Sequence, residues 1–438
     1  MENSAKRKVL ILTYYWPPAS GPGVQRFLKI SKYISDFGWQ PVILTVENTS
    51  SSSVDHSLGD DVNSLQVIKT KTFEPFEVYN RLSGKKGKQV GTGLIGFENN
   101  KGLFKKITLF IRANFFIPDA RKGWSRFALK EATRIIEENK IEAIITTGPP
   151  HSVHLIGLKL KKKFGLPLIA DFRDPWTNIF YNKFFPRTKR TKIKDKKLED
   201  SVLENADLVT VVSNGLSEEF KDRAKKIEVV YNGFDPADIP ETILEKTEIF
   251  RLSYIGNFKP NQNIKSFWEV ISELKNEIPD FSTNFRINLT GNLNSGLFEF
   301  IEKYDLKDIV ETNSYVAHSD AVKLMVNSGL LLFIIPNTDS NHLIITGKLF
   351  EYIASGSPVL SIGPIDGNAS EILRDSGRDE MIGYSEKDKI KEQIKKYYSL
   401  WLDNSGKLFK HPETDNHKFS RIYQANQFAD QLNLLSKK

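Results

Sequence analysis

Short apolar runs alternate with longer amphipathic segments along almost the entire chain. In the first half, strand-like runs occur at residues 9–13, 41–46, 66–70, 141–146, 167–171, 207–213 and 227–231. Between them, segments such as 124–139 and 152–164 carry apolar residues at the spacing of a helix with one buried face. Strands separated by helices pair in parallel through right-handed crossovers. The first half therefore predicts a doubly wound α/β domain.

The same alternation begins again at residues 250–255 and continues through strand-like runs at 286–290, 329–336 and 358–362. Between the two series, residues 232–247 collect Asn-Gly, proline and acidic residues without periodicity, which is typical of a linker. We expect two Rossmann-like domains with parallel sheets, at residues 1–232 and 248–410. Residues 411–438 follow as a separate segment that ends in one helix.

Composition narrows the class of protein. Of the 438 residues, 39% are hydrophobic and 26% are charged, which is ordinary for a globular protein. The chain contains no cysteine, so disulfides, thiolate metal sites and cysteine nucleophiles are excluded. No apolar run reaches the ~18 residues of a membrane span, and the N-terminal apolar run is too short for a signal peptide. We expect a cytoplasmic protein.

The positive charge is concentrated in one place. Lysine and arginine exceed aspartate and glutamate by 62 − 54 = 8, and the segment from Lys183 to Lys197 supplies eight basic residues against one acid. This segment is either a solvated loop and helix start or a site of attraction to an anionic membrane. No nucleic-acid-binding motif accompanies it, so we expect no nucleic acid partner. The apolar segment from Leu103 to Ile117 either packs on its own domain or lies in a membrane interface.

The loop after the first strand is a candidate anion site. Gly21 and Gly23 precede a helix, so the backbone can approach a ligand at the helix N-terminus. A dinucleotide fingerprint would need a third glycine where Arg26 stands, although Glu47 falls where a ribose-binding acid would belong. NAD binding therefore stays a minor alternative. No Walker loop is present.

The second half supplies a complementary signal. Thr346 and Gly347 can cap a helix, Lys348 lies in its first turn, and Glu351 follows one turn later on nearly the same face. A cation beside helix N–H groups suits a pyrophosphate, and a carboxylate can accept hydrogen bonds from a ribose. On their own, however, these residues fit a solvent-exposed Lys/Glu pair better.

Five segments in order along the chain resemble family 4 glycosyltransferases, which are nucleotide-sugar enzymes of the GT-B fold. They are KVLILTYYWPPASGPGVQR near the N-terminus, DFRDPW at 171–176, VYNGFD at 230–235, YIGNF at 254–258 and GKLFEYIASGSPVL at 347–360. The resemblance implies two facing Rossmann-like domains, acceptor-side and donor-side, and a last helix that crosses back to the first domain. It also implies retention of anomeric configuration. The sequence has no Asp-x-Asp motif in a plausible ligand-binding loop, so we expect no essential metal ion. We also expect no cofactor besides the sugar nucleotide.

The same resemblance implies roles for residues of the second domain. Glu351 matches the second glutamate of the family's E-x7-E motif, which holds the donor ribose, whereas Leu343 replaces the first glutamate. Lys348 is similar to the lysine that neutralises the donor pyrophosphate, with Thr346 and Gly347 beside it. Further donor contacts are expected from Asn257, Lys259 (or Lys265), Tyr315, Val316 and, from the first domain, the backbone of Gly23.

In the first domain, the resemblance and the strand ends point to His151, Arg173 and Asp174 as catalytic residues together with Lys348. The competing interpretations are structural histidines at His151 and His154 and a buried ion pair between Arg173 and Asp174.

We therefore expect transfer of a sugar from a nucleoside-diphosphate-sugar to a hydroxyl of a glycan or lipid-linked acceptor. Such transfer would serve polysaccharide or glycoconjugate synthesis, with peripheral contact to the inner face of the cell membrane through the segments 103–117 and 183–197. Two alternatives remain open. One is a sugar-nucleotide epimerase of the same fold. The other is a non-catalytic nucleotide- or glycan-binding subunit, which Leu343 favours.

Overall fold

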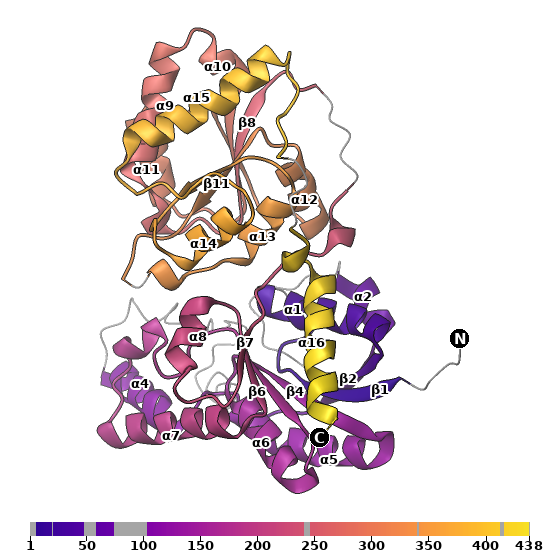
Figure 1. The fold of residues 1–438 in the computed structure, drawn as a ribbon. Coiled ribbons are helices and arrows are strands. Elements are labelled where there is room, and N and C mark those ends of the chain that lie inside the picture. The colour runs from indigo at the N-terminus through magenta and orange to yellow at the C-terminus, as the bar shows by residue number, and fades with distance from the viewer. Residues whose placement is uncertain are drawn as a thin grey trace, which may run out of the picture. The chain divides into compact units, whose positions relative to one another are not determined.

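The computed structural model describes residues 6–19, 21–47, 58–73, 103–240, 246–339, 341–411 and 416–437. The chain divides into two compact units, each built around its own sheet (Figure 1). The first unit contains Met1–Asn232 and Arg421–Lys438, and the second contains Gly233–Ser420. Within the described residues, none of the helices has the length and apolar character needed to span a membrane.

The first unit is built on a seven-stranded parallel sheet of strand order β3-β2-β1-β4-β5-β6-β7. The strand order reverses between β1 and β4, so the loops after these two strands border a crevice at the carboxyl edge of the sheet. The strands are β1 (Arg7–Leu12), β2 (Trp39–Val46), β3 (Gln66–Thr70), β4 (Ile141–Gly148), β5 (Leu168–Phe172), β6 (Leu208–Val211) and β7 (Ile227–Val229).

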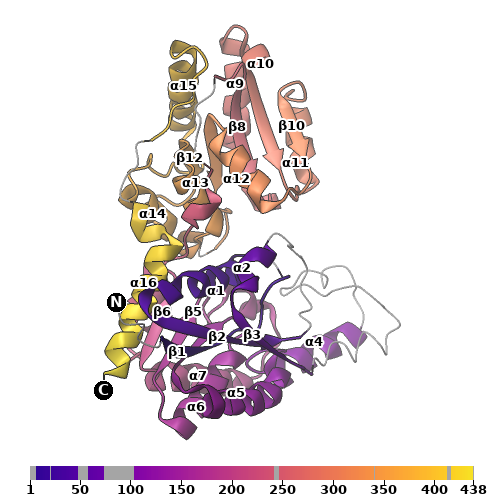
Figure 2. The same cartoon turned by 90° about the vertical axis from the view of Figure 1, so that its right-hand side faces the viewer.

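Helices cover both faces of this sheet (Figure 2). Side chains of β1 alternate between two cores, because successive residues of a strand point to opposite faces. Val9 and Ile11 pack with α1 and α16, whereas Leu10 and Leu12 pack with α5 and α6. The helices of this unit are α1 (Pro22–Tyr33), α2 (Gly59–Asn63), α4 (Leu103–Phe115), α5 (Ser125–Asn139), α6 (Ser152–Phe164), α7 (Lys189–Asn205), α8 (Asn214–Phe220) and α16 (Arg421–Ser436).

The C-terminal helix α16 belongs to the first unit, although it follows the second unit in the chain. The ring of Phe428 meets the ring of Phe27 on α1 edge to face, with 5.6 Å between the centroids. Asn433 accepts a hydrogen bond of 3.0 Å from the indole of Trp39. The expected return of the last helix is thus confirmed.

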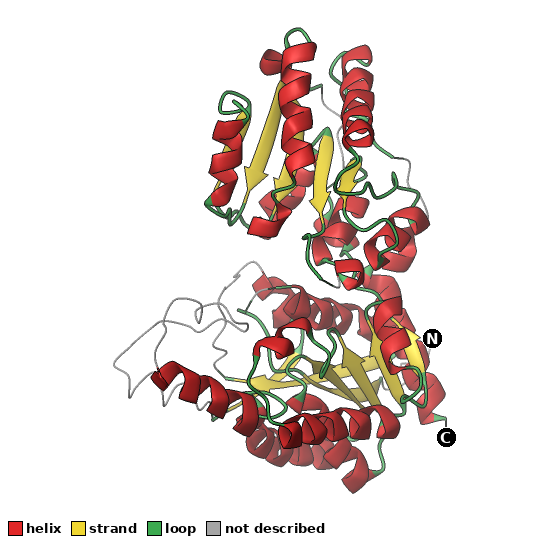
Figure 3. Cartoon of the chain, turned by 90° about the vertical axis from the view of Figure 1, so that its left-hand side faces the viewer, coloured by secondary structure: helices red, strands yellow, loops and turns green. Residues whose placement is uncertain are grey.

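The second unit repeats the design with a five-stranded parallel sheet of order β10-β9-β8-β11-β12 (Figure 3). The order reverses between β8 and β11. The strands are β8 (Phe250–Ile255), β9 (Phe285–Thr290), β10 (Val310–Asn313), β11 (Leu330–Ile334) and β12 (Val359–Ile362). The helices are α9 (Lys265–Glu277), α10 (Phe281–Asn284), α11 (Gly296–Lys303), α12 (His318–Val326), α13 (Gly347–Ala354), α14 (Asn368–Asp375) and α15 (Lys387–Asp403).

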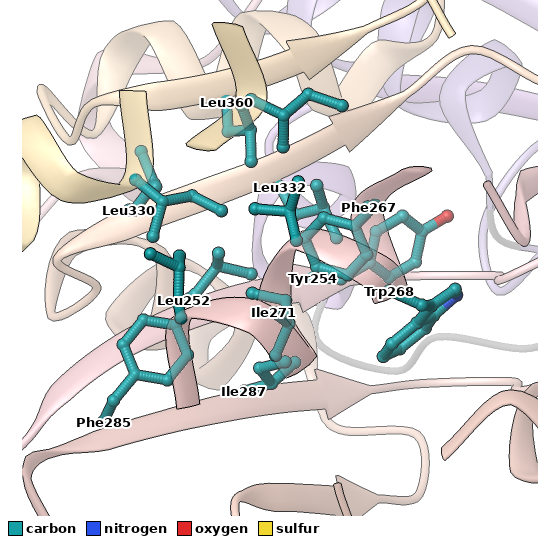
Figure 4. Packing of buried hydrophobic residues seen from close by; sticks show 14 of the residues in the cluster. Leu252, Tyr254, Phe267, Trp268, Ile271, Phe285, Ile287, Leu330, Leu332 and Leu360 are labelled. Carbon is teal, nitrogen blue, oxygen red and sulfur yellow. The ribbon is translucent and has the colours of Figure 1, made fainter. Parts of the chain in front are cut away.

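The core of the second unit lies between its sheet and the helices α9 and α15 (Figure 4). Leu252 of β8 and Leu330 and Leu332 of the neighbouring β11 pack with Phe267 and Trp268 of α9, and all five side chains are buried. Close packing of this kind holds the strand ends in place, so the loops that follow β8 and β11 start from rigid positions.

Candidate functional site

The donor-side residues expected from the sequence lie at the carboxyl edge of the second sheet. Asn257 and Lys259 follow β8, Tyr315 and Val316 follow β10, and Lys348 lies in the first turn of α13. In a doubly wound sheet this edge is where ligands bind, because the loops and helix N-termini converge there.

Lys348 lies against the end of β8. Its Nζ atom is 3.9 Å from the centroid of the Tyr254 ring, which places the ammonium over the aromatic face. A Cβ atom at position 256 would lie 2.9 Å from Nζ, so any other residue there would require the lysine side chain to move. Gly256 also has φ +126°, a conformation that other residues rarely adopt.

The surroundings of Lys348 disfavour its charge. Burial lowers the pKa of Lys348 to about 7, Glu351 opposes that change and Lys259 adds to it. A bound anion would stabilise the protonated form of this lysine, because an opposite charge nearby raises the pKa of an ammonium. Lys348 and Glu351 lie one turn apart on α13, and the charges of Glu351 and Lys259 both act on the pKa of Lys348.

Tyr254 joins Lys348 to the loop that carries Asn257 and Lys259, two of the other residues predicted to bind the donor. Its hydroxyl donates to the carbonyl of Asn257 at 2.6 Å and lies 3.2 Å from Oε1 of Gln262. The same Oε1 accepts a 2.8 Å hydrogen bond from the backbone N–H of Lys259. Sequence reasoning missed Tyr254, because a tyrosine in a buried strand is indistinguishable from an ordinary core residue.

The expected cap of α13 by Thr346 is only partly correct. Thr346 occupies the N-cap position, and its carbonyl accepts from the N–H of Leu349 at 3.1 Å. Its side chain makes no capping hydrogen bond, and Oγ1 is buried without a partner among the described residues. The N-terminal N–H groups of α13 are therefore not covered by the threonine hydroxyl.

Glu351 lies one turn after Lys348, beside a histidine that the sequence analysis did not single out. His318 begins α12, and its Nδ1 lies 3.8 Å from Oε1 of Glu351. Its Nε2 lies 3.4 Å from Oδ2 of Asp238, in the turn Pro236–Asp238. His318 thus connects the predicted ribose-binding carboxylate with the loop of Tyr315 and Val316 that precedes α12.

Two further donor-side expectations can be placed. Tyr315 is 67% exposed, whereas Val316 lines a cavity of about 500 Å³ together with Thr290, Asn313 and Ser314. Lys265, the alternative to Lys259, lies at the start of α9 and pairs with Glu269 at 3.0 Å. Lys259, not Lys265, is the lysine that acts on Lys348.

Leu343 ends the short helical turn Asn341–Leu343, which precedes α13. Its side chain is 41% exposed. The position where the family motif has its first glutamate is thus accessible, and it carries an apolar side chain.

In the first unit, the strand end at Asp171 is held by a buried network. Arg26 of α1 donates to Asp171 through Nη2 at 2.8 Å and Nε at 3.3 Å. Thr147 and Thr210, from the strands on either side, donate to the same carboxylate at 2.9 and 2.8 Å. Asp171 therefore has a structural role, because it ties three strands to α1.

His151 and His154 belong to an aromatic cluster. His151 stacks on Trp176 with 5.0 Å between ring centroids, and His154 stacks on Phe172 at 4.3 Å. Burial, helped by the charge of Arg173, lowers the pKa of His151 to about 3. His151 is therefore neutral near pH 7, and its predicted catalytic role would have to use the neutral ring.

Arg173 and Asp174 differ in their surroundings. Nη2 of Arg173 donates to the carbonyl of Pro149 at 2.7 Å, and its backbone N–H donates to Gly148 at 3.1 Å. Asp174 is exposed. Gly23 packs directly on the Arg173 guanidinium, because a Cβ at position 23 would overlap it. The structure thus brings Gly23 and Arg173 together at the crevice edge.

The described residues contain no group of three His, Cys, Asp or Glu side chains placed to hold a metal ion.

Comparison with known proteins gives a family match over part of the chain. Residues 96–238 match the model of Glycosyltransferase Family 4. Most of this match lies in the first unit, so that part of the chain is similar to the family. No curated protein matches the sequence.

Solved structures match the fold over nearly the whole chain. A sucrose-phosphate synthase from Thermosynechococcus elongatus has a TM-score of 0.61 at 12% identity, with 98% of this chain and 99% of that chain covered. A glycosyltransferase from Rickettsia africae has a TM-score of 0.60 at 15% identity, with 99% of each chain covered. The Anabaena protein HepE, solved with UDP and glucose, has a TM-score of 0.53 at 14% identity over 98% and 97%. The expected GT-B fold of two Rossmann-like domains is confirmed.

Proposed function

We propose that this glycosyltransferase moves a sugar from a nucleoside-diphosphate-sugar to a hydroxyl acceptor with retention of anomeric configuration. The observation that carries the proposal is Lys348. An ammonium whose charge is disfavoured lies at the N-terminus of a helix, against a glycine and one turn from Glu351. A diphosphate satisfies both the lysine and the helix N–H groups, and Glu351 suits the adjoining ribose.

In the proposed mechanism, the difficult charge develops on the leaving diphosphate. Lys348, Lys259 and the free N–H groups of α13 stabilise that charge, and no metal ion is needed. The acceptor hydroxyl attacks the face that the diphosphate leaves, and its proton passes to the departing phosphate oxygen. Since His151 is neutral near pH 7, we assign it no proton transfer and place it with Arg173 and Asp174 in shaping the acceptor and sugar site.

The acceptor is proposed to be a glycan or a lipid-linked saccharide at the cytoplasmic face of a membrane, in polysaccharide or glycoconjugate synthesis. The donor class is supported by the fold shared with HepE, which was solved with UDP and glucose.

The first test is thermal stabilisation by a panel of nucleoside diphosphates and their sugars in the presence of EDTA. A ligand at a hundred times its Kd should stabilise the protein by about 2.7 kcal/mol, which raises the melting temperature measurably. The shift should disappear in Lys348→Ala and Glu351→Ala and persist in Lys265→Ala, the matched control. A shift that survives Lys348→Ala would contradict the assignment.

Product analysis then separates transfer from the two alternatives. Incubation of the stabilising sugar nucleotide with a lipid-linked acceptor should give a glycoside whose anomeric configuration, read by NMR, equals that of the donor. Conversion of the donor alone would show an epimerase. Binding of nucleotide without any product would show a non-catalytic subunit, for which Leu343 at the exposed motif position would be the natural reason.

A further inference from the structure

Four large apolar side chains of helix α4 are exposed. Ile107, Phe110, Ile111 and Phe115 are between 43% and 64% exposed. Their spacing of three and four residues places them along one side of the helix. Ala113, in contrast, is buried. Among the described side chains of α4, the small Ala113 is thus buried, whereas these four large apolar side chains face the solvent.

The end of α4 is joined to the start of the basic segment. Nδ2 of Asn114 donates to the carbonyl of Pro186 at 2.9 Å. Oδ1 of Asn114 accepts from the N–H of Thr188 at 2.8 Å and from the hydroxyl of Thr191 at 2.7 Å. Arg112 lies over the ring of Phe185 at 5.3 Å. Two segments that are about 70 residues apart in the sequence are therefore fastened side by side.

The basic segment adds charge and further apolar groups to this region. Phe184 and Ile193 are 54% and 49% exposed. The acid of the segment, Asp195, is buried and bound by Arg187 and by the indole of Trp176. The exposed charges are therefore all positive, on Lys183, Lys189, Arg190, Lys192, Lys194 and Lys197.

We propose that α4, Phe184 and the first turns of α7 form one docking surface for an anionic lipid bilayer. This docking surface consists of Ile107, Phe110, Ile111, Phe115, Phe184, Ile193 and the exposed lysines and arginine around them. Apolar side chains enter the boundary of headgroups and acyl chains, while the basic side chains stay with the anionic headgroups. This inference deepens the proposed function, because it supplies the partner that a lipid-linked acceptor requires.

The charge of the docking surface separates a bilayer from other occupants. A second copy of this chain would bring two arrays of lysine together, and like charges repel. A nucleic acid would meet the positive charges but would leave the isoleucine and phenylalanine side chains without favourable contacts. An anionic bilayer matches both properties.

The test is flotation of the full chain with vesicles of phosphatidylcholine, with and without phosphatidylglycerol. Binding is expected only with the anionic lipid and should weaken as salt is raised. Phe110→Ser combined with Ile111→Ser, and separately Arg190→Gln combined with Lys194→Gln, should each weaken binding by about tenfold or more. Phe298→Ser and Lys323→Gln are the matched controls, since Phe298 is 50% exposed and Lys323 is exposed on the second unit, and both should bind as the unmodified protein does.

Several results would overturn the proposal. The unmodified protein could fail to bind anionic vesicles, or the control variants could lose as much vesicle binding as the docking-surface variants. Light scattering could also show a dimer that the Phe110 and Ile111 changes convert to a monomer. The unmodified protein could also fail to bind vesicles while the Phe110 and Ile111 changes lower the melting temperature. That combination would show that another part of this chain covers the docking surface. Nucleotide-induced stabilisation is measured on the same samples, so that loss of membrane binding is distinguished from failure of the donor site.

Discussion

The ammonium of Lys348 lies over the ring of Tyr254, with Nζ 3.9 Å from the ring centroid. A desolvated cation gains ~2 kcal/mol from an aromatic face. The ring thus supports the charge of a lysine whose surroundings otherwise lower its pKa to about 7. The hydroxyl of the same tyrosine donates to the carbonyl of Asn257, so one side chain contacts two parts of the proposed donor site.

Two substitutions separate these functions of Tyr254. Tyr254→Phe keeps the ring and loses the hydroxyl, so KM for the donor should rise about threefold, as expected for one hydrogen bond. Tyr254→Leu also loses the aromatic face, and the rise should reach about thirtyfold. Steady-state kinetics on samples matched by melting temperature provide the measurement. Equal effects of the two changes would show that the ring has no role in holding the lysine.

Diphosphate affinity should depend on pH through Lys348. The ligand-free pKa is about 7, so the lysine loses its proton as the pH rises above that value. Affinity should then fall from pH 7 to pH 9, with a limiting slope of about tenfold per pH unit. Isothermal titration should show this slope in the unmodified protein and not in Lys348→Arg, which keeps its charge. A flat profile in the unmodified protein would contradict the pKa.

The same pKa makes a prediction for stability without ligand. Between pH 7 and the ordinary lysine pKa of 10.5, the unfolded chain binds a proton that the folded chain does not. This group therefore disfavours folding in that window, and its unfavourable effect decreases as the pH rises. Lys348→Met should raise the melting temperature of the ligand-free protein at pH 8 while it abolishes stabilisation by diphosphate. A lower melting temperature would show that the charge stabilises the fold.

Gly256 can be tested against a glycine of similar conformation. Gly256 and Gly38 have φ values of +126° and +86°, but only at position 256 would a Cβ meet Lys348. Both Gly→Ala changes should cost about 1–2 kcal/mol of stability through backbone strain. Only Gly256→Ala should also weaken diphosphate binding, by about tenfold or more. Similar binding losses in both variants would indicate a general effect on the fold.

The two aspartates of the DFRDPW segment should respond differently to the same change. Asp171→Asn breaks a buried ion pair with Arg26 and should cost about 3–5 kcal/mol in chemical denaturation. Asp174 is exposed, so Asp174→Asn should change stability by less than about 0.5 kcal/mol. If Asp174 is catalytic, that variant should still lose at least tenfold in turnover. Unchanged turnover would remove Asp174 from the site.

Strand positions were largely predictable from the sequence. The runs at 66–70 and 250–255 coincide with β3 and β8. The β8 strand is buried at five of its six positions, as expected for a central parallel strand covered on both faces. Lys348 and Glu351 were also predictable, since three residues of helix place two side chains on nearly one face. The absence of a side-chain cap at Thr346 was not predictable. Whether a hydroxyl reaches a backbone N–H depends on a side-chain rotation that a sequence pattern does not encode.

The sequence by itself determined two parallel α/β units, the helices that begin at their carboxyl edges and the polar residues in those loops. These follow from local periodicity, which depends on neighbouring residues alone. Only the tertiary structure decided which distant side chains meet. It placed Tyr254 beside Lys348, His318 beside Glu351, and Asn114 of α4 against the basic segment. Such contacts depend on how complete strands and helices pack, and each packing is a property of the whole fold.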